Sequence, residues 1–162
     1  MLVTERVKVE VFDEGLKLGC ADAEAGGEAL ANGWLKIEPV LERLAESAVK
    51  LSEGENISRA DAETLLSAVE KKAELLVDEK LLSDLAKMYR LQVWSTWTLL
   101  LKSLSRDYVR LDEMERAVGE LGKKKFRLNG KQAQEILDAA NFIEKRRKTI
   151  GTNVENLMFL TQ

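Results

Sequence analysis

Carboxylates are the residues of this chain best suited to chemistry. The 162-residue sequence contains no histidine and one cysteine, which excludes Ser-His and Cys-His nucleophilic catalysis and every histidine-ligated zinc site. Asp78 and Glu79 follow an apolar run at 75–77 that is typical of a buried parallel strand. Asp61 lies near the start of a predicted helix, and Glu10 lies in an earlier one. If such acids converge, they bind Mg²⁺ or Mn²⁺, which neutralises a phosphodiester and activates a water molecule.

Each of these acids also has an interpretation without chemistry. Asp61 stands three residues after Ser58, which is the spacing of a helix capping box. Asp78 and Glu79 would cap the next helix and favour its positive N-terminal dipole. Glu10 lies among charged neighbours, as a solvated helix position does. Only the joint order of the acids favours a metal site over these interpretations.

The hydrophobic pattern predicts strands that alternate with helices. Short apolar strands are expected at residues 1–4, 34–38, 75–77 and 91–94. Helices are expected at residues 5–18, 41–51, 58–72, 80–89, 95–104, 111–121 and 130–147, with a loose helix or ordered loop at 22–32. This alternation predicts a helix-rich α/β fold with a short parallel sheet. An all-α fold is the alternative, because periodicity does not separate short buried strands from helix segments.

Composition limits where nucleic acid could bind. Hydrophobic residues make up 45% of the chain and charged residues 33%, which is typical of one folded domain. The net charge of −3 excludes a uniformly basic surface, so binding is expected at a local patch. Two basic clusters are candidates, one formed by Lys123, Lys124, Lys125 and Arg127 and the other by Lys145, Arg146 and Arg147. Their alternative role is as solvated helix ends near a negative dipole.

Three further features bear on location. The single Cys20 cannot form an internal disulfide, and the sequence has no signal-peptide pattern. No apolar run approaches the roughly 20 residues of a membrane-spanning helix. Together they predict a cytoplasmic protein without a membrane partner.

The order of several short motifs resembles PIN-domain proteins, in particular the prokaryotic nucleic-acid-binding group related to VapC-type toxins. The motifs are Glu10 in an early helix, Ala60-Asp61-Ala62-Glu63 at a helix start, Asp78-Glu79 after a strand, Ser95-Thr96 at another helix start, and Phe126-Arg127-Leu128 between two C-terminal helices. The resemblance covers residues 2–147. It implies a three-layer α/β/α fold, with a PIN-like domain at 1–150 and a C-terminal tail at 151–162.

The same resemblance implies a toxin-like endoribonuclease that depends on Mg²⁺ or Mn²⁺. It assigns metal ligation to Glu10, Asp61 and Asp78, with Glu79 as a further acid at the site. Thr96 or Ser95 is expected to orient a water molecule or a phosphate. RNA is the expected substrate, and an antitoxin or another protein is the expected partner.

The chain departs from the PIN pattern at its first strand. PIN domains begin with an apolar strand that ends in a metal-binding aspartate, whereas this chain starts at the counterpart of the second strand. The carboxylate site is therefore incomplete, which opens a second hypothesis of an inactive scaffold that binds RNA or protein. That strand lies inside the PIN sheet, so its absence predicts unpaired strand edges. A partner segment, a homo-oligomer or a rearranged sheet is expected to compensate. The equal alternative is that the natural protein begins earlier than this sequence and has the strand itself. An all-α interaction domain is the third hypothesis.

Overall fold

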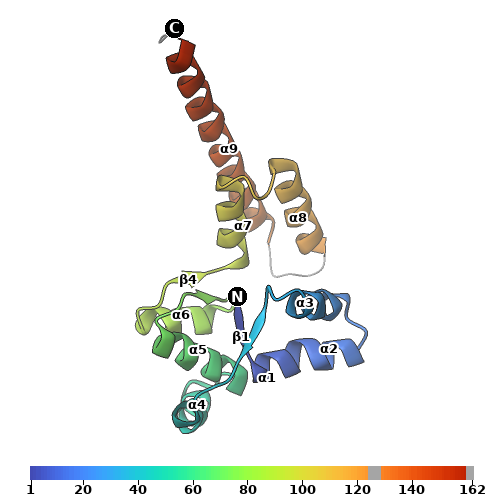
Figure 1. The fold of residues 1–162 in the computed structure, drawn as a ribbon, viewed down its shortest axis with the longest axis vertical. Helices are drawn as coiled ribbons and strands as arrows, with labels where there is room; N and C mark the ends of the chain where they lie inside the picture. The colour runs from blue at the N-terminus through green and yellow to red at the C-terminus, as the bar shows by residue number, and fades with distance from the viewer. Residues whose placement is uncertain (124–128, 160–162) are drawn as a thin grey trace. The chain divides into compact units, whose positions relative to one another are not determined.

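The structure is a computed structural model that describes residues 1–123 and 129–159. The chain divides into two compact units, Met1–Val93 and Trp94–Gln162, and Figure 1 shows the elements of each. No helix in the described ranges is both long and apolar enough to cross a membrane.

Unit 1 begins with a strand, followed by a helical segment that changes from α-helix to π-helix and back to α-helix. β1 (Leu2–Thr4) leads into α1 (Glu5–Val7), a π-helix η1 (Lys8–Asp13) and α2 (Glu14–Lys17). In η1, Lys8 Nζ donates to Asp13 Oδ2 at 2.8 Å, and the five-residue separation matches the hydrogen-bond spacing of a π-helix. This hydrogen bond raises the pKa of the Lys8 ammonium. The predicted helix at 5–18 is present, with a π-helical centre.

The glycine pair at 26–27 lies inside a regular helix. α3 (Ala21–Ala31) covers the segment for which the sequence left a loose helix or an ordered loop open. The ring of Phe12, which is 8% exposed, lies against this helix. A Cβ on Gly26 would come 2.2 Å from Phe12 Cε1, whereas a Cβ on Gly27 would meet nothing within 4 Å. Gly26 therefore allows a close approach of the aromatic ring.

The first pair of strands is parallel. β2 (Lys36–Glu38) pairs with β1 in the register Leu2↔Lys36, Val3↔Ile37 and Thr4↔Glu38. The strand begins two residues later than predicted, because Leu35 N donates to Ala29 O at 3.0 Å and still closes the end of α3. This pair confirms a helix-rich α/β fold with short parallel strands, and the all-α alternative is wrong.

Two helices follow and pack together. α4 (Glu42–Glu55) continues through the polar run expected to end it and stops at Asn56, whose φ is +53°. α5 (Arg59–Lys71) starts after Ser58, whose side chain accepts a hydrogen bond from Asp61 N, and it ends before Lys72 at φ +51°. The buried face of α5 contributes Leu65 to the core of unit 1, whose other buried members are Ala48, Ile57, Ala62, Ala68, Leu75, Leu82, Leu85 and Ala86.

A second pair of strands closes unit 1. β3 (Leu75–Leu76) is joined through α6 (Lys80–Met88) to β4 (Val93–Trp94), and Leu75 N donates to Gln92 O at 2.9 Å. The β3-β4 pair is a separate two-stranded sheet from the β1-β2 pair. Within the described residues, β1 pairs only with β2 and β3 only with β4, so each of these strands has one edge without a strand partner.

Unit 2 is helical beyond the end of β4. Its helices are α7 (Thr96–Ser105), α8 (Leu111–Lys123) and α9 (Gly130–Phe159). Ser95 and Thr98 form a reciprocal capping box at the start of α7. The buried core consists of Leu104, Met114, Val118 and Ala140, and Trp97 packs against it. The predicted end of the last helix at residue 147 is wrong, because α9 continues to Phe159.

The Gly26 contact predicts opposite effects for two adjacent substitutions. Gly26→Ala should lower the free energy of unfolding by about 1–3 kcal/mol, because the new methyl group collides with the Phe12 ring. Gly27→Ala should raise it by up to about 1 kcal/mol, because alanine favours a helix and open space surrounds the site. Urea denaturation followed by circular dichroism measures both. Equal effects at the two positions would show that Phe12 does not pack on α3 as described.

Candidate functional site

Asp61 is engaged at the N-terminus of α5. The Ser58 hydroxyl donates to Asp61 Oδ2 at 2.8 Å and accepts from Asp61 N at 3.0 Å. Ser58 is thus the N-cap residue, and the local spacing interpreted as a helix cap is confirmed for the serine. The Asp61 side chain is half-buried, and its carboxylate accepts the hydrogen bond from the hydroxyl group of Ser58, the N-cap residue of α5.

The other predicted acids are exposed and lie on separate elements of unit 1. Glu10 is in η1, Asp78 follows β3, and Glu79 is the N-cap residue of α6 without a side-chain capping bond. Thr96 is the first residue of α7 and belongs to unit 2. Among the residues whose positions are described, no three acidic or thiol side chains approach closely enough to hold a metal ion. The metal assignment therefore stays a prediction.

The acid that the fold encloses is Glu63, two residues after Asp61. It is 6% exposed, and its Oε1 accepts from Arg59 Nε at 2.9 Å and from Arg6 Nε at 3.2 Å. Arg59 lies one turn earlier on α5 and also donates from Nη2 to Ala45 O of α4 at 2.6 Å. The buried carboxylate thus joins α1 to α5, and Arg59 extends the contact to α4. We call Thr4, Arg6, Arg59, Glu63 and Thr64 the Glu63 cluster.

Two hydroxyl groups complete the cluster. Thr4 at the end of β1 is 3% exposed, and its Oγ1 accepts from Val7 N at 3.4 Å. The same oxygen lies 3.5 Å from Thr64 Oγ1, in the residue after Glu63. In the described part of the chain, every buried side-chain nitrogen and oxygen has a hydrogen-bond partner. The cluster is internally satisfied.

The Glu63 cluster does not fit a divalent cation. Mg²⁺ and Mn²⁺ are held by oxygen ligands whose negative charge balances the ion. Here two guanidinium groups balance the one buried carboxylate and hydrogen-bond to it. Sequence reasoning gave Glu63 no role. The four-residue spacing from Arg59 was visible, but the contact with Arg6 spans 57 residues and leaves no local signal.

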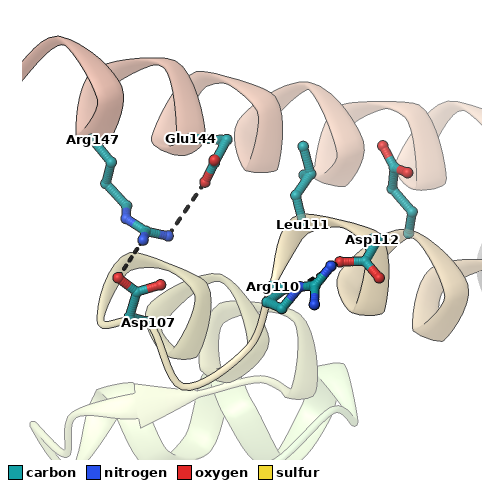
Figure 2. Close-up of a pocket in the computed structure, with 7 residues that line it drawn as sticks. Asp107, Arg110, Leu111, Asp112, Glu144 and Arg147 are labelled. Atoms are coloured by element: carbon teal, nitrogen blue, oxygen red, sulfur yellow. Dashed lines mark hydrogen bonds and ion pairs between the residues drawn. The ribbon is translucent and has the colours of Figure 1, made fainter.

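The basic residues of α9 have different surroundings. Arg147 forms ion pairs with Asp107 and Glu144 (Figure 2). Its Nη1 also donates to Leu104 O at 3.3 Å. Lys145 and Arg146 are exposed. Of the other predicted cluster, Lys124, Lys125 and Arg127 lie outside the described residues, as does the side chain of Lys123. The nucleic-acid assignment stays a prediction for both clusters.

A surface hollow of about 340 Å³ adjoins Arg147 in unit 2. Its lining is mostly charged and consists of Asp107, Arg110, Leu111, Asp112, Glu115, Glu144 and Arg147 (Figure 2). Four carboxylates outnumber two guanidinium groups. Because Arg147 is paired with Asp107 and Glu144, and Arg110 with Asp112, the hollow is unsuited to a phosphate backbone.

The sequence was compared with models of known protein families. A model of the PIN-domain family covers residues 1–142. The chain belongs to the PIN-domain family. The resemblance that its motifs suggested is thereby confirmed, and Asp61, Glu63 and Asp78 all lie within the matched range of this PIN domain. No curated protein and no solved structure matches the chain.

The Glu63 cluster predicts a large cost for removing its carboxylate charge. Glu63→Gln should lower the free energy of unfolding by about 1–3 kcal/mol, because two guanidinium groups lose their buried counter-charge. Glu70→Gln is the matched control on the same helix. Glu70 pairs with Arg43 at a side chain 36% exposed, so its loss should cost less than about 1 kcal/mol. Urea denaturation of both variants is the measurement, and equal costs would contradict a buried cluster.

Proposed function

We propose that this PIN domain binds nucleic acid, with RNA as its ligand, and that the acids at the start of α5 serve the fold. The structural role of these acids rests on the Glu63 carboxylate, which Arg6 and Arg59 hold. Asp61, in the same motif, is bonded to the N-cap residue Ser58. Both acids of the motif are thus engaged in protein contacts. Membership of the PIN-domain family supports nucleic acid as the ligand.

The exposed cations of α9 supply the phosphate contacts in this proposal. Lys145 and Arg146 are adjacent and exposed on α9. In a chain of net charge −3, attraction to phosphates has to come from such local positions. Binding of this kind is sequence-tolerant and weakens as salt rises.

Removing these two charges should weaken RNA binding and its salt dependence. For Lys145→Ala with Arg146→Ala, the slope of log Kobs against log salt for single-stranded RNA should become shallower by about 1.4, since each lost phosphate contact contributes about 0.7. Lys17→Ala with Lys50→Ala removes two exposed cations from unit 1 and is the matched control. Fluorescence anisotropy with labelled RNA at several salt concentrations measures both. Identical slopes in the two double variants would exclude this part of α9 as the phosphate site.

A second candidate function is a Mg²⁺- or Mn²⁺-dependent endoribonuclease of the toxin type. Family membership favours it, as do the exposed acids Glu10, Asp78 and Glu79 in unit 1. A bound cation would neutralise the phosphate and supply a nucleophilic water molecule, and Thr96 is the residue expected to orient the water. If the protein is such a nuclease, its expected partners are an antitoxin and further copies of the same chain.

Metal binding separates the two candidates. The binding proposal predicts no Mn²⁺ dissociation constant below about 1 mM and uncut RNA. Isothermal calorimetry on the wild type, Asp78→Asn and Asp84→Asn, followed by an RNA-cleavage assay on the same samples, is the test. Asp84 is an exposed acid of α6 paired with Lys87 and serves as the matched control. Tight Mn²⁺ binding and cleavage that only Asp78→Asn abolishes would establish the nuclease and contradict the first proposal.

A further inference from the structure

Phe142 carries an aromatic ring on the side of α9 that faces away from the core of unit 2. It is 63% exposed, and among the α9 side chains that the structure describes no other large apolar one is exposed. It follows the buried Ala140 by two residues, which places it about 200° around the helix from that core position. The residues of α9 that pack against the core are Ala133, Ile136, Leu137 and Ile143. The Phe142 ring is therefore in contact with water.

Two exposed cations lie one turn after this ring. Lys145 and Arg146 follow Phe142 by three and four residues and are both exposed. That spacing places side chains on one face of a helix, with Cβ atoms about 5–6 Å apart. The Cα–Cβ bonds of a helix tilt toward its N-terminus, which directs both cationic side chains toward the turn that carries the ring. An aromatic ring and two positive charges thus share one exposed face of α9.

The exposed acids of this face lie on the other side of the ring. Asp138 stands one turn before Phe142, and its Oδ1 accepts from Gln134 Nε2 at 2.8 Å. Glu135 Oε1 lies 3.8 Å from Lys131 Nζ. The negative charges are therefore N-terminal to the ring, and the two cations are C-terminal to it. A phosphate close to the ring is attracted to the C-terminal side.

We propose that Phe142 is a base-contacting residue, on whose ring one base of a single-stranded RNA stacks while Lys145 and Arg146 bind the neighbouring phosphates. This inference rests on the proposed function and extends it from phosphate contacts to a base contact. A neutral ring adds nothing to the attraction of phosphates, but every base has a face that stacks on an aromatic side chain. Bases of a duplex already stack on one another, so such a site favours single strands.

Three substitutions at Phe142 separate stacking from other contributions. Phe142→Ala should weaken the binding of a labelled oligouridine at least about fivefold, because a stacked base is lost. Phe142→Leu should weaken it as much, since leucine is apolar but has no ring, whereas Phe142→Trp should bind at least as tightly as the wild type. Fluorescence anisotropy is the measurement. Tyr108→Ala removes a ring of unit 2 that is 77% exposed and adjoins the ion-paired Asp107; this matched control should leave the affinity unchanged.

An RNA strand without bases provides a measurement that a purely structural role of Phe142 would not produce. An abasic ribose-phosphate strand of the same length should bind the wild type and Phe142→Ala equally, and so should duplex RNA. The salt dependence of oligouridine binding should also be the same for both proteins, because no phosphate contact is removed. An equal loss of affinity for abasic and intact strands would show that the substitution disturbs α9, and it would overturn the proposal.

Failure of stacking is distinguishable from failure of RNA binding. If Phe142→Ala binds oligouridine like the wild type while Lys145→Ala with Arg146→Ala gives the shallower salt slope, stacking is overturned and the phosphate contacts stand. If the wild type binds no RNA, both proposals are overturned. A dimer in sedimentation that Phe142→Ala dissociates, with RNA binding unchanged, would assign the ring to a contact between copies of the chain and would overturn stacking.

Discussion

The ion-paired Glu63 is the interaction on which the arrangement of unit 1 depends. A buried carboxylate is costly unless cations and hydrogen bonds compensate it, and here Arg6 and Arg59 do so. Arg6 belongs to α1, which continues directly from β1, so the pair fastens the first parallel strands to α5. The leucine core around Leu65 lies on the same helix. α5 is thus the element that both strand pairs share.

This constraint also limits the chemistry available at α5. A carboxylate that already forms ion pairs with two guanidinium groups is a poor ligand for a divalent cation. Asp61 is hydrogen-bonded to the N-cap residue Ser58. The exposed acids Glu10 and Asp78 lie on other elements. In the proposed function, the exposed cations of α9 contact the nucleic acid and the acids of α5 are structural.

Local features of the fold could be predicted from the sequence, and long-range ones could not. Ser58 followed by Asp61 predicts a helix cap, and the run at 75–77 predicts a strand, because both depend on neighbouring residues. The glycine pair at 26–27 was uninformative, since the role of Gly26 is to accommodate Phe12, fourteen residues earlier. The contact of Glu63 with Arg6 and that of Arg147 with Asp107 depend on the tertiary fold. For that reason the enclosed acid of the candidate site was missed.

The most direct test of the account is RNA binding in the absence of divalent metal. Fluorescence anisotropy of a labelled single-stranded RNA would be measured with the wild-type protein in EDTA and again with added Mn²⁺. The account predicts the same dissociation constant in both conditions, because the phosphate contacts come from cationic side chains. Binding that requires Mn²⁺, or no binding in either condition, would contradict it.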